Sequence, residues 1–130
     1  MSAAADVVRA ALVLALKAQG ELVGIAGLDA EAGAGSLPRL SVDVPEVGDW
    51  GTKTARGREV RTAVTLRVAH GQRLRLPGLV DAVEAAGVAL NGNIGGWWIG
   101  SAVLLRSRVA DQADGSRVAT VEHRVRVLEN

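Results

Sequence analysis

The sequence predicts an α+β fold: a two-layer sandwich with two helices on one face of a four-stranded, mainly antiparallel sheet, in the chain order α-β-β-α-β-β. Two segments carry apolar residues at helical spacing, and four others alternate between apolar and polar residues. Such alternation is typical of a sheet with one face buried and the other exposed to water. The 130 residues contain no repeat and no linker long enough to divide them, so residues 1–130 are expected to form one domain.

The first helix is predicted from about Ala3 to Ala18. Ser2 is a suitable N-cap, Asp6 lies near the positive end of the helix dipole, and Gly20 can end the helix. The apolar run inside it stops at Lys17, which leaves it too short to span a bilayer, and no small-residue cleavage pattern follows. We therefore expect a soluble protein that is made in the cytoplasm and has no membrane partner.

A loop and two strands are predicted next. Residues 20–37 are rich in Gly and Ala and are expected to form a loop with one short turn. The first strand follows Pro38 and ends near Pro45, and the second spans about Arg58 to Ala69. Alternation directs these side chains toward the core: Leu40, Val42, Val44, Val60, Val64, Leu66 and Val68. It directs these to the outer face: Arg39, Ser41, Asp43, Glu59, Arg61, Thr65 and Arg67.

The second helix is predicted from about Pro77 to Ala86. Pro77 suits a first helical turn, apolar residues then recur at helical spacing, and Gly87 is a natural stop. The segment 91–96 is expected to be a turn-rich connector. Its glycine spacing does not match the dinucleotide-binding or P-loop patterns, and it lacks the P-loop lysine, so we expect no phosphate site there.

Two further strands are predicted to form a hairpin. The third runs from about Trp97 to Val109 and the fourth from Arg117 to Leu128, with a turn around Asp114-Gly115. The core-facing residues are expected to be Ile99, Val103, Leu105, Val109, Ala119, Val121, Val125 and Val127. On the fourth strand, the outer face is expected to carry Glu122, Arg124 and Arg126.

Composition and charge exclude several classes of protein. The chain has no cysteine, so it has no disulfide framework, thiolate zinc site or cysteine nucleophile, and its two histidines leave little for a metal site. The net charge of +1 conceals a basic block, since residues 51–75 hold seven basic residues and one acidic residue. Such a block can attract an acidic partner or a phosphate backbone, or it can form a solvated face. Thirteen of the fifteen basic residues are Arg, which reflects either GC-rich coding or a surface with many contacts.

No catalytic grouping stands out. Carboxylates are spread singly, and no serine stands in a nucleophile-elbow pattern. His123 shares the inward parity of Val121 and Val125 and is interpreted as a core histidine with one hydrogen bond, and His70 is interpreted as a turn residue. We expect no enzymatic activity, no cofactor and no metal.

Three features favour an interaction protein instead. The first is the polar segment 49–59 between the first two strands, in which Trp50 either folds back onto the sheet edge or orders on a partner. The second is the pair Trp97 and Trp98. Adjacent strand residues point to opposite faces, so Trp97 is expected in the core and Trp98 in an exposed apolar patch, unless the loop at 20–37 or a tail covers it. The same parity adds to that patch Gly100, Ala102 and Leu104.

The third feature is the arginine content of the outer sheet face. Beside the Trp98 patch it is a plausible docking surface for a neighbouring subunit, although a solvated face explains any single charge. By parity this face collects Arg39, Arg61, Arg67, Arg106, Arg108, Arg124 and Arg126.

The segment Asp-Trp-Gly-Thr-Lys-Thr that begins at Asp49, and leads through Gly57 and Glu59 into an alternating strand, resembles the tail completion proteins of long-tailed bacteriophages. That family includes the tail terminators of phage-like gene transfer agents. The resemblance is best over Asp49–Val68, and the leading helix and final hairpin agree in order and length. Between residues 69 and 96 the chain departs from the family pattern, with a shorter second helix and no aromatic strand end.

The resemblance implies a non-enzymatic virion protein at the tail–neck junction. Family members form a hexameric ring that caps the tail tube and joins it to the head–neck complex, and DNA passes through the channel. The implied partners are five further copies, a tail tube protein and a stopper or connector protein of the neck; DNA is expected to pass without specific binding. We expect Trp50 to anchor these contacts, with Lys53 and Arg56 as charge partners. The full set of interface candidates is Trp50, Lys53, Arg56, Arg58, Trp98, Leu104, Arg106 and Arg108.

Two other classes of function remain open from the sequence. One is a small dimeric α+β ligand-binding or enzymatic domain, whose pocket would form around His123 and Trp97. The other is a basic nucleic-acid-binding module, which the absence of Phe and Tyr and the near-zero net charge make less favourable.

Overall fold

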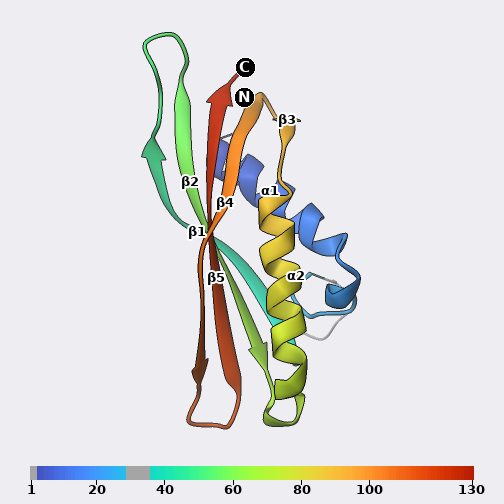
Figure 1. The fold of residues 1–130 in the computed structure, drawn as a ribbon. Coiled ribbons are helices and arrows are strands. Elements are labelled where there is room, and N and C mark those ends of the chain that lie inside the picture. Colours follow the sequence, from blue (N-terminus) through green and yellow to red (C-terminus); the bar gives the residue numbers. More distant parts are fainter. Residues whose placement is uncertain (1–2, 29–35) are drawn as a thin grey trace.

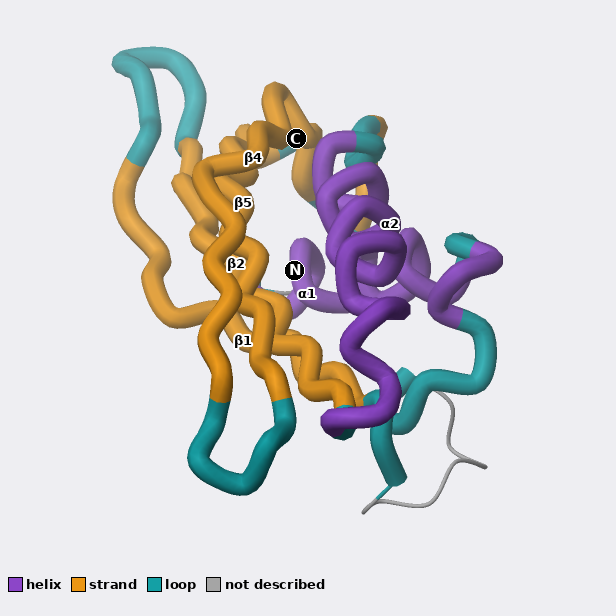
Figure 2. The backbone as a smooth tube through the Cα atoms, turned by 60° about the horizontal axis from the view of Figure 1, so that its bottom comes forward, coloured by secondary structure: helices purple, strands orange, loops and turns teal. Residues whose placement is uncertain are grey.

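The computed structural model describes residues 3–28 and 36–130, which form two layers (Figure 1). The main elements are α1 (Ala4–Lys17), β1 (Arg39–Asp49), β2 (Gly57–Val68), α2 (Leu76–Val88), β3 (Gly92–Ile94), β4 (Trp97–Asp111) and β5 (Arg117–Glu129), with short 3-10 turns at Gly20–Leu22 and His70–Arg75. The strands form one antiparallel sheet in the order β1-β2-β5-β4-β3, and both helices cover the same face of it (Figure 2). The α+β prediction is therefore confirmed.

The predicted strand number and chain order are wrong, because the structure has a fifth strand, β3, between α2 and β4. Gly95 and Gly96 both have positive φ, so the chain reverses within two residues and β3 pairs with the start of β4. The glycine content of this segment argued against a strand. The backbone pairing with Trp97 and its neighbours overrides that local preference.

The first helix is confirmed within one residue at each end. α1 buries Val8, Leu12 and Leu16 against the sheet, and Asp6 lies in its first turn. The N-cap is Ala3, without a side-chain hydrogen bond, and Ser2 lies outside the described residues. Gly20 does not end the helix, which closes at Lys17 with Ala18 as C-cap; Gly20 instead begins the following 3-10 turn.

Pro45 does not end the first strand, as the sequence suggested. β1 continues to Asp49 because a bulge between Asp43 and Glu46 places two residues, Val44 and Pro45, opposite one residue of β2. Proline has no N–H to donate and is tolerated in an edge strand at a bulge. The strand therefore keeps its pairing with β2 on both sides of Pro45.

Two bulges in β4 change which side chains face the helices. Register shifts at Gly100 and Leu105 each insert one unpaired residue. The predicted core positions Val103 and Leu105 are therefore wrong, since Val103 lies opposite outward-facing Arg124 and Leu105 is an exposed bulge residue. Val109 faces the helix side as predicted, but it is 54% exposed and does not belong to the core. The residues that do face the helices between the bulges are Ala102 and Leu104, which the sequence assigned to the outer face.

The helix α2 is longer than predicted and does not stop at Gly87. Gly87 is buried inside the helix, where its lack of a side chain lets the backbone approach the ring of His123 on β5. Glu84, one turn earlier, accepts a hydrogen bond of 2.6 Å from the hydroxyl of Ser107 on β4. These contacts fix α2 over the β4–β5 half of the sheet. Apart from Trp97, the hydrophobic core cluster is aliphatic.

Candidate interaction surface

The face of the sheet opposite the helices, called here the open face, has a line of ion pairs along its centre. Arg126 on β5 donates from Nε to Oε1 of Glu59 on β2 at 3.0 Å, and Nε of Arg124 lies 3.7 Å from the same oxygen. None of these three side chains is more than 32% exposed. Partial burial reduces screening by water, so these pairs order the face more than exposed pairs would.

Two further pairs lie toward the outer strands. On the β1 side, Arg61 lies 3.8 Å from Glu46, and on the β4 side Arg106 pairs with Glu122. The hydrogen bond from Arg106 lowers the pKa of Glu122, which keeps this carboxylate charged. Three groups of ion pairs thus follow one another across the open face, from β1 over β2 and β5 to β4.

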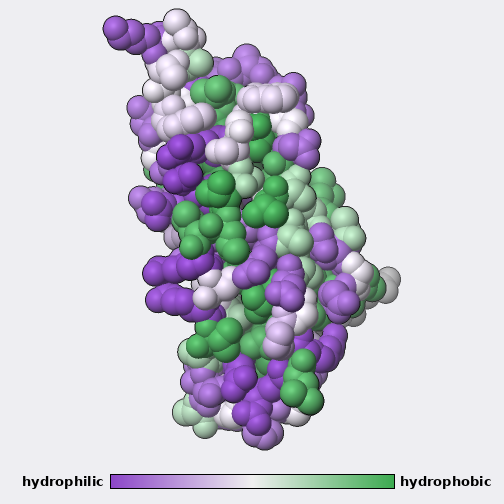
Figure 3. Space-filling view, in the orientation of Figure 1, coloured by the Kyte–Doolittle hydropathy of each residue, from purple (hydrophilic) through white to green (hydrophobic). Residues whose placement is uncertain are grey.

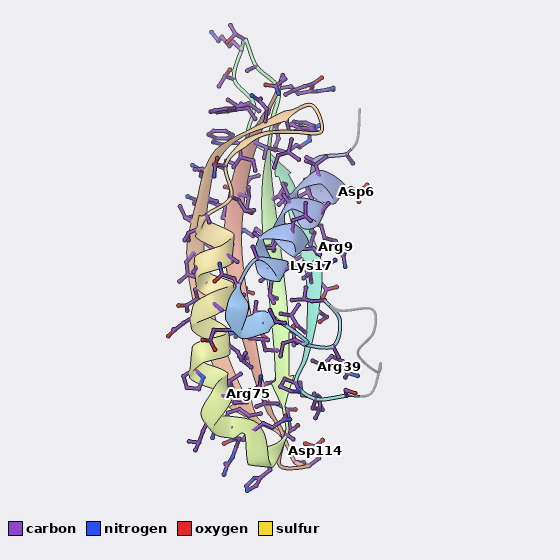
Figure 4. The ribbon with its side chains drawn as sticks, turned by 90° about the vertical axis from the view of Figure 1, so that its right-hand side faces the viewer. Asp6, Arg9, Lys17, Arg39, Arg75 and Asp114 are labelled. Carbon is purple, nitrogen blue, oxygen red and sulfur yellow. The ribbon has the colours of Figure 1, made fainter. Side chains whose placement is uncertain are left out.

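Two charges on the open face differ from the rest. Asp43 on β1 and Arg108 on β4 are exposed, and within the described residues neither forms a hydrogen bond or an ion pair. Arg67 pairs at 3.6 Å with Asp114 of the β4–β5 turn, which Figure 4 shows at one end of the molecule. These two charges therefore lie on β1 and β4, the outer two of the four long strands.

Trp50 folds back onto the open face. It follows β1, and its amide donates to the carbonyl of Gly57 at 3.2 Å. The Arg126 guanidinium lies over the indole ring, 5.3 Å from its centroid, and the far edge of the ring approaches Gly100 of β4. This stacking is a cation–π contact, worth about 0.5–1 kcal/mol at a partly exposed site. Of the two positions that the sequence left open for Trp50, the structure has the one on the sheet.

Trp98 lies on the same face, as predicted, and 45% of it is exposed. Its cross-strand partner on β5 is Leu128, which also pairs with Gly57 of β2. The predicted companions Ala102 and Leu104 lie on the helix side instead, because of the bulge at Gly100. Figure 3 shows that, in the view of Figure 1, apolar side chains form separate patches between charged ones.

The loop between β1 and β2 projects beyond the sheet (Figure 1). It is internally bonded: the Thr52 amide donates to the carbonyl of Ala55 at 2.7 Å, and the Thr52 hydroxyl accepts from the amides of Thr54 and Ala55. Lys53 is exposed at the tip and makes no hydrogen bond or ion pair with the described residues. The loop thus presents a positive charge on a defined turn.

The interface candidates do not form one cluster. Trp50, Trp98, Arg106 and Arg108 share the open face, and Lys53 and Arg56 lie on the loop. Arg56 lies 3.7 Å from Glu129. Arg58 lies on the helix side of the sheet, 3.3 Å from Asp49, and Leu104 lies on the helix side of β4. The alternation of residues along the strand predicted that Arg126 lies on the outer face. It could not predict the contact between Arg126 and Trp50, because that contact depends on β2 pairing with β5.

His123 is a core residue, in agreement with the interpretation from sequence. It is fully buried, its Nε2 lies 3.1 Å from the carbonyl oxygen of Glu84, and burial lowers its pKa. Trp97 pairs with Glu129, while His123 pairs with Leu104, so the two residues lie on different rows of the sheet. Among the described residues, these two side chains are therefore too far apart along β5 to line one pocket together.

Within residues 3–28 and 36–130, no helix is long and apolar enough to cross a membrane. The same residues contain no group of three or more His, Asp or Glu side chains placed to hold a metal ion. The outer side of α1 carries Asp6, Arg9 and Lys17 (Figure 4).

Comparison with protein-family models finds no match, and neither does comparison with curated protein sequences. Among solved structures, the chain is similar to a chain in the virion of a native gene transfer agent particle. The TM-score is 0.80, the sequence identity is 18%, and the match covers 98% of this chain and 99% of the other. At that identity the match shows a shared fold, which extends over the whole length of both chains.

Proposed function

We propose that this protein is a tail terminator: a structural virion protein whose six copies form a ring that caps the tail tube and joins it to the head–neck complex, with DNA passing through the channel. The observation that carries the proposal is the shared fold, from end to end, with a chain of a gene transfer agent virion. The resemblance of residues 49–68 to tail completion proteins supports the same role independently of the fold. On this proposal the protein acts in the virion at the tail–neck junction and has no enzymatic activity.

The surface features fit this role. A subunit of a closed ring needs two different faces for its neighbours and further faces for its axial partners, so a small domain must use much of its surface for contacts. The open face offers ordered ion pairs beside half-buried Trp50 and exposed Trp98. The loop at 51–56 projects away from the sheet (Figure 1), and its residue Lys53 is exposed. We assign the loop to the tail tube or to a neighbouring subunit.

Native mass spectrometry, with and without assembled tail tubes, tests the ring. We expect six copies, either in the protein alone or added at a tube end. A dimer that is indifferent to tubes would contradict the proposal and would favour the alternative of a small dimeric α+β domain.

A charge reversal tests the loop separately. Lys53→Glu changes a side chain without an intramolecular partner among the described residues, so the melting temperature should be unchanged while tube capping falls. The matched control is Lys17→Glu, at the other lysine of the chain, which lies at the end of α1. Wild-type capping by the Lys53 variant would remove the loop from the contact and leave the ring proposal in place. Trp50→Ala is less suitable alone, because Trp50 also packs on its own sheet.

DNA passage requires weak contact with the duplex. Binding that neutralises many phosphates would hold the genome in the channel, and such binding weakens steeply with added salt. We therefore expect little duplex affinity near physiological salt. Tight, strongly salt-dependent binding would count against the proposed role.

A further inference from the structure

Two of the long strands have a free edge. β1 pairs on one side with β2, and β4 pairs beyond Ile99 with β5 alone, since β3 covers only its first three residues. The start of β1 is covered, because Leu40 donates to the carbonyl of Ala26 and Arg9 donates to the carbonyl of Val42. Within the described residues, 43–49 of β1 and 101–111 of β4 have no strand on their outer side. Such edges expose backbone groups that can pair with another chain.

The two free edges carry opposite charges on the open face. β1 presents Asp43 and Glu46 there, and β4 presents Arg106 and Arg108. Glu46 and Arg106 are already paired within the subunit. Asp43 and Arg108 form no hydrogen bond or close ion pair in the described part of the chain, and Arg108 acts on Glu122 only through its charge. The two exposed charges outside these ion pairs are therefore one acid and one base, at opposite edges of the same face.

On the helix side, both edges carry exposed apolar residues. Val47 of β1 lies opposite buried Val60 and is 45% exposed, while on β4 Leu104 is 39% and Val109 is 54% exposed. The two edges thus match on both faces of the sheet, apolar with apolar on one and acidic with basic on the other.

We propose that neighbouring copies of this chain join edge to edge, with β4 of one copy antiparallel to β1 of the next. The direction follows from the sheet order, because β1, β2, β5 and β4 alternate in direction, and a second β1 beside β4 continues the alternation. The inference rests on the proposed function, since it identifies the contact between ring subunits. The contact is heterologous, so it repeats from copy to copy and can close into a ring.

One register brings both charge pairs and one apolar pair together. With Arg108 opposite Asp43, Arg106 comes next to Glu46 on the open face, and Leu104 comes opposite Val47 on the helix side. The extra residue of the β1 bulge and the extra residue Leu105 of β4 then lie beside each other in this pairing, so the register before the bulges and the register after them agree. If β4 slipped by one residue along β1 of the next copy, each side chain would meet a residue that faces the opposite side of the sheet. A strand without a matching bulge would pair correctly on only one side of the bulge. The bulges therefore make the edges specific for each other.

Charge reversal with complementation tests the contact. Asp43→Arg alone places an arginine opposite Arg108, and Arg108→Asp alone places an aspartate opposite Asp43. Like charges in contact cost several kcal/mol, so each variant alone should lose ring assembly by at least about tenfold in native mass spectra. An equimolar mixture should restore rings with alternating subunits, because each contact then joins opposite charges. The double variant, in which both charges are exchanged, should assemble by itself.

The outcomes separate this inference from the proposed function. If wild-type protein forms rings of six and each single variant also forms them, the edge contact is refuted and the terminator role stands. If wild-type protein with tail tubes stays monomeric, both are refuted. If assembly depends on the two charges but the copy number is not six, the edge contact is supported and the hexamer is refuted.

A disulfide provides a second test, because the chain has no cysteine of its own. Val47→Cys and Leu104→Cys lie on opposite edges of one sheet, so a bond between them can only join two copies. Oxidation of the double variant should give a ladder of covalent oligomers up to the ring. The control pairs Leu104→Cys with Val23→Cys, which is 74% exposed but lies off both edges, and should give no ladder. Equal ladders from the two double variants would refute the register.

Discussion

Replacing Gly87 with alanine should destabilise the protein, although the same change in an ordinary helix stabilises it. Gly87 lies in α2 and is buried. A Cβ at this position would lie 2.1 Å from Nε2 of His123 and within 2.4 Å of two ring carbons. Nonbonded atoms of this size are comfortable at about 3.5–4.0 Å. The helix or the ring must therefore move by more than 1 Å, roughly the difference between those distances.

The expected magnitude is a sum of opposing effects. Replacing glycine inside a helix stabilises by about 1 kcal/mol. Overpacking a core costs about 1–3 kcal/mol, and moving His123 breaks its contact of 3.1 Å with the carbonyl of Glu84, worth about 1 kcal/mol. The net expected loss is about 1–3 kcal/mol. At about 4 °C per kcal/mol for a domain of this size, the melting temperature should fall by roughly 4–12 °C.

Urea unfolding followed by circular dichroism measures this change, and Gly78→Ala is the matched control. Gly78 lies in the same helix, and the nearest atom to its added Cβ would be Oε2 of Glu21 at 3.9 Å, so this variant should be as stable as the wild type or more stable. Combining Gly87→Ala with His123→Ala removes the clash, so the double variant should be no less stable than His123→Ala alone. A Gly87→Ala protein at least as stable as the wild type would refute the proposed contact between α2 and β5.

Two other predictions follow from the same part of the structure and from the start of β1. Burial lowers the pKa of His123 below its ordinary value of 6.5, so the unfolded chain takes up the proton before the folded protein does. The unfolding free energy should therefore fall as the pH drops below about 6.5. The slope of the unfolding free energy against pH is at most about 1.4 kcal/mol per pH unit. His123→Gln should remove this part of the slope in urea unfolding, whereas exposed His70→Gln should retain it; equal slopes for His123→Gln and wild type would contradict the burial argument. Gly27→Ala should lower the unfolding free energy by more than about 3 kcal/mol, because φ is +98° and the new Cβ would lie 1.9 Å from the carbonyl oxygen of Leu40. Gly24→Ala is the control: φ is +79° but the space around the new Cβ is open, so the loss should be only about 1 kcal/mol. Equal losses for the two glycine variants would show that the Leu40 contact is unimportant.

The burial of individual residues in β2 and β5 was predictable, and that in β4 was not. β2 and β5 pair without a register shift, so strict alternation holds and residues such as Val64 and Val121 are buried as expected. In β4 the bulges at Gly100 and Leu105 each reverse the alternation, and between them the assignment of Val103 and Leu104 is exchanged. The two reversals cancel, which is why Arg106 and Arg108 lie on the predicted face.

The end of a helix is likewise not always predictable from the local sequence. Gly87 follows a run of helical spacing and has the residue type that commonly ends a helix. Its actual role depends on His123, 36 positions later in the chain, which occupies the space where a side chain would lie. No local pattern contains that information.

The sequence by itself determined the class of fold, the two helices, four of the strands and the aliphatic character of the core, because these depend on periodicity and residue type over short segments. It also placed Trp98 on the open face, together with Arg61, Arg67, Arg124 and Arg126. The tertiary structure alone decided that Trp50 lies under Arg126, that Asp43 and Arg108 occupy opposite free edges, and that the bulges of β1 and β4 lie at one level. Those features depend on the order in which the strands pair, and strand order is set by the packing of the whole sheet against its helices rather than by any one segment.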